Sequence, residues 1–136
     1  MINKAILIGN LGADPEVRYM PNGDPIATLR LATTRRWKDR NTNERKEETE
    51  WHRVTFFGAL GKTCESYLKK GSKIYVEGRI KTEKYQKNGV DTYTTGIVGE
   101  VLTMLDGKSD SGNQQQPQQQ HQPRQSQPDY SDDVPF

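Results

Sequence analysis

The sequence predicts an all-β domain with one short helix, followed by a disordered C-terminal tail. Five segments alternate apolar or β-branched residues with polar ones, turn residues separate these segments, and almost every aliphatic and aromatic side chain precedes residue 106. A chain of 136 residues suffices for one domain plus attachments. We therefore expect a domain over residues 1–105, a Gln/Pro-rich linker over 106–128 and an acidic tip over 129–136.

The first three strands are bounded by turn signals and charged stretches. The predicted strands run from Asn3 to Leu11, from Ile26 to Arg35 and from Thr49 to Phe57. The sequence "GADP" ends the first strand, "PNGDP" precedes the second, and "KDRNTNERKEE" precedes the third. Gly, Pro, Asn and Asp favour turns for distinct conformational reasons, so these boundaries have a physical basis.

A short helix is predicted after the third strand. Leu60, Cys64, Tyr67 and Leu68 are spaced i, i+4, i+7 and i+8, which predicts one apolar stripe, and the "KKG" sequence at 69–71 is suited to end the helix. On such a stripe Cys64 is expected to be a core residue rather than a nucleophile.

The last two strands are predicted to form a hairpin. The fourth runs from Lys73 to Arg79 and continues toward Tyr85, and the fifth runs from Asp91 to Leu105. The Asn-Gly pair at 88–89 is typical of a type I′ turn. The order β-β-β-α-β-β fits a five-stranded OB-fold barrel, a fold that binds oligonucleotides on one face.

Charge divides the chain at the same boundary as hydrophobicity. Residues 1–105 carry 18 Lys and Arg against 13 Asp and Glu, whereas residues 106–136 carry 2 against 5, and the whole chain has a formal net charge of +2. A basic body with an acidic tail suggests a polyanionic ligand for the body and a separate role for the tail.

Several classes of protein are not supported by the sequence. The longest apolar run near the start is too short for a signal peptide, and no stretch approaches the roughly 18 apolar residues of a membrane span. The single Cys64 excludes an internal disulfide or a cysteine metal cluster. No catalytic constellation is convincing, because Phe56 stands where a P-loop needs its first glycine. We expect a cytoplasmic, nucleoid-associated protein that is not an enzyme and uses no cofactor or metal.

The third strand, "TEWHRVTFFG", is the most informative segment. Alternation places Trp51, Arg53 and Phe57 on one face, opposite the core-like pair Val54 and Phe56. Exposed rings stack on unpaired bases and a cation meets phosphate, so this face predicts a binding site for single-stranded nucleic acid. The alternative is that a subunit contact buries this second face; we favour stacking.

Two further rings stand among cations. Trp37 lies in "TRRWKDR", and Tyr85 lies in "KTEKYQKNG". Burying such a ring would bring its cationic neighbours toward low dielectric, which is costly. Both rings are therefore predicted to lie on the surface in basic surroundings.

These motifs together resemble a known family. The stretches are "NKAILIGNLGADPEVRYMPNGDPIATLRLAT", "EWHRVTFFG", "YLKKGSKIYVEGRI" and "DTYTT", with "DDVPF" at the end of the tail. They closely resemble bacterial single-stranded DNA-binding protein over nearly all of residues 1–105 and at the tip. The resemblance implies an OB-fold homotetramer that binds single-stranded DNA without sequence preference. It also implies docking of replication, recombination and repair proteins through the tip.

The alternation and the resemblance together give a set of expected site residues. Those for DNA are Trp37, Trp51, Phe57, Tyr85, Arg35, Arg36, Lys38, Arg53, Lys70 and Lys84. The resemblance implies subunit contacts at His52 and Tyr75, and partner binding by Asp132, Asp133, Val134, Pro135 and Phe136. The chain departs from better-known members in two ways: they often have Trp where Tyr85 stands, and their tip usually has three consecutive acidic residues.

Two other functions remain open at this point. A binder of single-stranded RNA would use the same rings and cations, because both polymers offer bases and phosphates. A protein-protein adapter would use the basic rings as an interface. The resemblance favours DNA.

Overall fold

The structure is a computed structural model that describes residues 1–106, so the predicted tip and all of the linker after Asp106 lie outside the described part. It has six strands and one helix, namely β1 (Ala5–Leu11), β2 (Glu16–Tyr19), β3 (Pro25–Lys38), β4 (Arg45–Phe57), α1 (Gly58–Tyr67), β5 (Lys73–Lys87) and β6 (Val90–Met104). No helix among these residues is long and apolar enough to cross a membrane. The prediction of a mainly β domain with one short helix is confirmed.

Five of the strands close into a barrel. Strand β3 pairs antiparallel with β1 and β4, and β5 pairs antiparallel with β1 and β6. The ring closes where β4 pairs parallel with β6, at Val54 opposite Ile97 and Thr55 opposite Val98. This closed arrangement, with α1 between the third and fourth barrel strands, is the predicted OB-fold.

Strand β2 was not predicted. It covers four residues and pairs antiparallel with the first half of β3, from Glu16 opposite Thr28 to Tyr19 opposite Pro25. Its side chains are mostly exposed, so it lacks the apolar alternation that identified the other strands. Pairing with a neighbouring strand, rather than burial, accounts for its extended conformation.

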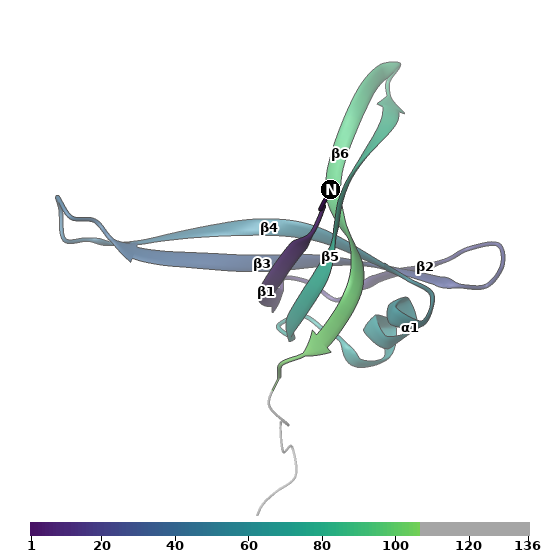
Figure 1. Cartoon of the computed structure of the whole chain (residues 1–136), viewed down its shortest axis with the longest axis horizontal. Coiled ribbons are helices and arrows are strands. Elements are labelled where there is room, and N and C mark those ends of the chain that lie inside the picture. The colour runs from purple at the N-terminus through teal and green to yellow at the C-terminus, as the bar shows by residue number, and fades with distance from the viewer. Residues whose placement is uncertain (107–136) are drawn as a thin grey trace, which may run out of the picture.

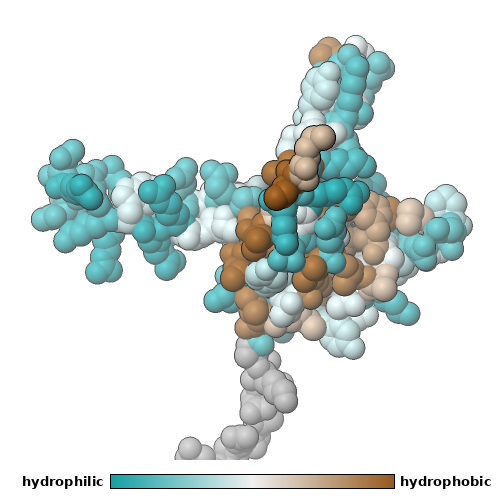
Figure 2. All heavy atoms as spheres, in the orientation of Figure 1, coloured by the Kyte–Doolittle hydropathy of each residue, from teal (hydrophilic) through white to brown (hydrophobic). Residues whose placement is uncertain are grey.

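Two hairpins extend beyond the barrel. The β3–β4 pair continues to Lys38 opposite Arg45, and the β5–β6 pair continues to Lys87 opposite Val90. The β3–β4 arm is longer than predicted, whereas the β5–β6 arm nearly matches its predicted extent. Figure 1 shows the two arms projecting in different directions from the barrel. Figure 2 shows that hydrophilic side chains cover the β3–β4 arm, which explains why apolar alternation did not reveal its length.

The turn of the β5–β6 arm is the one that the sequence predicted. Asn88 and Gly89 have φ values of 53° and 76°. A type I′ turn requires positive φ at both central residues, and its twist matches that of the flanking strands. The turn therefore sets the register that places Tyr85 opposite Thr92.

The barrel core is built around the inner face of β4. Val54 and Phe56 are fully buried, together with Leu29 and Leu31 of β3. The Phe56 ring lies against Gly99 of β6, where a Cβ atom would come within 2.2 Å of the ring. A side chain at Gly99 would therefore displace the largest of the fully buried residues.

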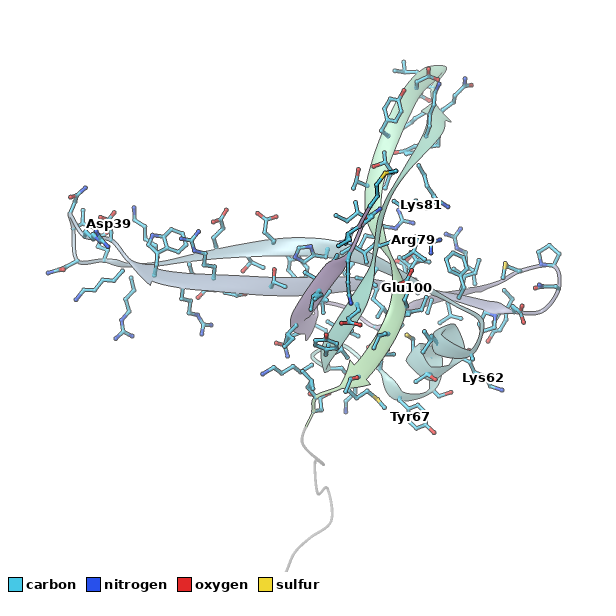
Figure 3. The ribbon with its side chains drawn as sticks, viewed as in Figure 1. Asp39, Lys62, Tyr67, Arg79, Lys81 and Glu100 are labelled. Atoms are coloured by element: carbon cyan, nitrogen blue, oxygen red, sulfur yellow. The ribbon has the colours of Figure 1, made fainter. Side chains whose placement is uncertain are left out.

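Helix α1 covers the barrel with Cys64, as predicted, but not with Tyr67. Cys64 is fully buried, and burial raises the pKa of its thiol to about 12, so the group stays protonated at neutral pH. Tyr67 is 69% exposed, and Figure 3 shows it below α1, pointing away from the strands. The prediction that Tyr67 belongs to the apolar stripe was wrong. Helical spacing identifies residues on one face of the helix, but it does not determine how far the barrel extends beneath that face. Leu68 is buried after the helix ends, in an extended conformation.

The two consecutive phenylalanines of β4 give a matched test of this core. We expect Phe56→Ala to lower the free energy of unfolding by about 3–5 kcal/mol, because it empties a packed site. Phe57→Ala should cost much less, since Phe57 is 46% exposed. Urea denaturation of both variants at one protein concentration measures the difference, and equal losses would contradict the assignment of faces.

Candidate functional site

A groove of about 690 Å³ lies between β4 and the β5–β6 arm. It brings together four residues that the sequence analysis selected, Arg53, Phe57, Lys84 and Tyr85. Their strands meet at the parallel pairing between β4 and β6, so closure of the barrel creates the groove. The other predicted DNA-binding residues do not line the groove.

The orientation of β4 follows from its buried face. Because Val54 and Phe56 are fully buried, alternation turns Arg53 and Phe57 outward. The pairing of β4 with β3 extends this face, since Thr28 lies opposite Thr55 and supplies part of the groove lining. The groove floor therefore belongs to the outer face of β3 and β4.

Sequence reasoning missed Arg18 and Arg30 and noted Lys81 only as a neighbour of Tyr85. Arg18 of β2 and Lys81 of β5 line the groove, and Arg30 of β3 lies directly opposite Arg53. Alternation between the buried Leu29 and Leu31 already indicates that Arg30 faces outward, but its place beside Arg53 depends on strand register.

The Arg30 and Arg53 pair has an electrostatic consequence. Within residues 1–106 no carboxylate lies at ion-pair distance from either guanidinium, as the salt bridges show. Like charges directly opposite each other destabilise a sheet. An anion bound between them would relieve this repulsion, so the pair favours a negatively charged ligand.

Trp51 lies next to the groove floor, above a glycine. It is opposite Ala32, and a Cβ atom on Gly12 would come within 2.2 Å of its ring. The amide of Gly12 donates to the carbonyl of Arg30 at 2.9 Å, so the loop after β1 is held beside the floor. Glycine here leaves room for the ring, which is still 60% exposed and can stack with a ligand.

Trp37 lies farther along the β3–β4 arm. The Arg35 guanidinium lies 5.0 Å from the centre of its ring, a cation–π contact. Trp37 and Trp51 lie on opposite local faces of the two-stranded arm. Trp51 is paired with Ala32 and therefore shares its face. Trp37 lies five residues beyond Ala32 on β3, and an odd spacing along a strand places two side chains on opposite faces. Sequence reasoning identified both rings but not this relation.

The other predicted cations lie on the β3–β4 arm or in the turn after α1 and do not line the groove. Arg36 shares the local face of Trp51 and forms an ion pair with Glu47 at 3.0 Å. Lys38 lies opposite Arg45, a further like-charge pair at the end of the arm. Lys70 lies in the turn after α1, where its amide donates to Asp14 at 2.8 Å in the same loop as Gly12.

The predicted contact residues His52 and Tyr75 lie apart from the groove. The Nε2 atom of His52 lies 2.8 Å from the hydroxyl of Thr33. The hydroxyl of Tyr75 donates to Glu77 at 2.8 Å, which raises the pKa of Tyr75. The same hydrogen bond is the main cause of the lowered pKa of Glu77, followed by Lys4 at 3.3 Å.

Rings and cations along one face of an OB barrel are the features by which this fold binds oligonucleotides. The sequence pattern that defines the Single-strand binding protein family matches residues 2–105 of this chain. The chain belongs to the single-strand binding protein family.

Solved structures show the same likeness. Plasmodium falciparum SSB, in a complex with single-stranded DNA, is similar with a TM-score of 0.69 and 37% identity, over 78% of this chain and 96% of that one. A deletion mutant of the single-stranded DNA binding protein from Thermus aquaticus is similar with a TM-score of 0.68 and 32% identity, over 79% of this chain and 52% of that one. The match thus spans about half the length of the Thermus chain.

Proposed function

We propose that this protein binds and protects single-stranded DNA, without requiring a particular sequence, during replication, recombination and repair. The observation that carries the proposal is the groove in which Phe57 and Tyr85 lie among Arg18, Arg53 and Lys84. Membership of the family and the likeness to a structure containing single-stranded DNA support it. The proposed activity is binding alone, with no chemical step.

In the proposed complex, unpaired bases stack on Phe57 and Tyr85 while phosphates contact Arg53 and Lys84. The strand then continues past Arg30 toward Trp51, whose exposed ring provides a further stacking surface. Stacking tolerates every base because every base has a π face, and phosphates are common to all nucleotides. Binding therefore does not depend on one sequence.

RNA and protein are the competing ligands. An RNA strand offers the same bases and phosphates, but the likeness to two proteins described as binding single-stranded DNA favours DNA. A protein surface has less regular negative charge than a polynucleotide, whereas the Arg30 and Arg53 pair favours repeated anionic groups. We therefore rank single-stranded DNA first.

Stacking is tested by changing exposed rings one at a time. We expect Trp51→Ala and Phe57→Ala each to weaken binding of a fluorescently labelled thymidine oligomer by about 1–3 kcal/mol per stacked base, the range known for proteins of this kind. Tyr67→Ala is the matched control, because Tyr67 is an exposed ring on α1 outside the groove lining. Fluorescence anisotropy provides the affinities.

The same titration should be repeated over a range of salt. Affinity should fall with a log–log slope of roughly −0.7 per phosphate neutralised. A flat salt response, or full affinity in both ring variants with their folds intact, would contradict the proposal and favour the adapter.

We infer further that the chain assembles as a homotetramer. Ile6 and Ile8 are 57% and 52% exposed on the outer face of β1, and Ile8 lies opposite Tyr75 of β5. Figure 2 shows hydrophobic residues gathered over this part of the barrel. Subunit contacts over this face and over the region around His52 would remove apolar surface from water, which favours assembly.

Assembly is tested by Ile8→Glu and His52→Tyr, which should both lower the mass measured by light scattering in dilute solution. The first places a charge on the outer face of β1, and the second replaces the ring whose Nε2 atom contacts Thr33. Val90→Glu is the control, because Val90 is also exposed but lies at the tip of the β5–β6 arm. An unchanged mass in both test variants would contradict the proposed contacts.

The tail is proposed to recruit replication, recombination and repair proteins. Asp132, Asp133 and the terminal carboxylate would meet a basic rim, and Phe136 would enter an apolar pocket of the partner, as in the capture of a chain terminus. Pro135 would limit the freedom lost on docking. These residues lie outside the described part of the chain, so the proposal rests on their chemistry and on the resemblance of the tip.

Deletion of Phe136 should abolish capture of partners from a bacterial lysate and leave affinity for a thymidine oligomer nearly unchanged. The replacements Asp132→Asn and Asp133→Asn together should weaken capture and slightly strengthen DNA binding, because they remove negative charge that repels phosphate. Retention of the partners after deletion of Phe136 would refute the role of the ring.

A further inference from the structure

One carboxylate lines the groove among its cations. Glu83 of β5 is the single acidic residue among the lining residues that the structure describes, beside Arg18, Arg53, Lys81 and Lys84. Its Oε1 atom lies 3.2 Å from the Nζ atom of Lys81. Both side chains are more than half exposed, so this ion pair is weak and leaves Glu83 free to exchange partners.

Glu83 lies close to Tyr85, one of the proposed stacking rings. Glu83 and Tyr85 are two residues apart on β5, so they share a face and lie about 7 Å apart along the strand. Thr94 lies directly opposite Glu83, and Thr92 lies directly opposite Tyr85. A base stacked on Tyr85 would therefore have its edge close to Glu83 and Thr94, both of which line the groove.

If the groove bound only phosphates, a carboxylate in this position would lower its affinity for the strand. Its negative charge repels the backbone of any bound strand and partly cancels the attraction of Lys81 and Lys84. The cost is offset if the carboxylate accepts hydrogen bonds from a base. Proteins that recognise single strands use the Watson–Crick edges of unstacked bases in this way.

Guanine is the base that fits a carboxylate best. Its Watson–Crick edge carries two adjacent donors, the N1–H and the N2 amino group, which match the two acceptor oxygens of an ionised carboxylate. Thymine places its single N3–H between two carbonyl oxygens, which repel a carboxylate. Adenine and cytosine offer one amino group beside an acceptor nitrogen.

We propose that Glu83 gives the groove a preference for guanine at the base that stacks on Tyr85. The inference rests on the proposed function, because it concerns a base within a bound single strand. It adds a position-dependent preference to binding that otherwise tolerates any sequence. Thr94 completes the subsite with a hydroxyl that can accept or donate.

The test uses the full chain and thymidine oligomers of about ten nucleotides, within the site size of one OB-fold. A single guanine is moved through the oligomer one position at a time. At the favoured position the wild-type protein should bind about fivefold more tightly than it binds the all-thymidine oligomer, the lower end of the range for a bidentate base contact. Inosine at that position lacks the N2 amino group and should lose most of the gain.

Glu83→Gln should strengthen binding of the all-thymidine oligomer and weaken binding of the oligomer with guanine at the favoured position. Binding of the all-thymidine oligomer should strengthen, because a negative charge leaves the groove, and the preference for guanine should fall to about one. Glu100→Gln is the matched control: Glu100 forms a similar exposed ion pair with Arg79 at 3.3 Å but does not line the groove. Figure 3 shows Arg79 and Glu100 near Lys81, where β5 and β6 leave the barrel. This control should keep the wild-type preference.

The outcomes separate this inference from the proposed function. If wild-type protein binds all single-guanine oligomers and the all-thymidine oligomer equally, or if Glu83→Gln keeps the preference, the role of Glu83 is refuted while single-strand binding stands. Failure of the wild-type protein to bind any of these oligomers would instead refute the proposed function.

Discussion

The packing of the Phe56 ring against Gly99 is the contact on which the groove depends. It joins the inner face of β4 to β6 beside the parallel pairing of Val54 with Ile97. Because strand side chains alternate, burying Phe56 turns Phe57 outward, and a slip of one residue would exchange the two faces. The same contact places the start of the β5–β6 arm beside β4, so one packing constraint determines both walls of the groove.

The outer face that results is arranged for a ligand with repeated negative charge and flat apolar groups. Arg30 and Arg53 repel each other across the β3–β4 pairing, while the rings of Trp51 and Phe57 keep a large exposed fraction. Both features cost stability in the free protein. A polynucleotide with unpaired bases would offset both costs at once, and this coupling explains why rings and cations occur on the same face.

Local patterns in the sequence predicted much of the fold and part of the site. The inner and outer faces of β4 follow from alternation, and the turn at 88–89 follows from the conformational freedom of Asn and Gly. Non-local features could not be predicted in this way. The position of Arg30 beside Arg53, the contribution of Arg18 and the strand β2 all depend on pairing register, and the exposure of Tyr67 depends on where the barrel ends beneath α1.

The central claim is that the outer face of β4 and the β5–β6 arm hold the single strand. Photo-cross-linking of an iodouracil-containing oligomer, followed by mass analysis of the cross-linked peptides, tests it most directly. The account predicts cross-links at the rings that border the groove, Trp51, Phe57 and Tyr85. Cross-links confined to rings that do not line or adjoin the groove, such as Tyr75 or Tyr67, would contradict it.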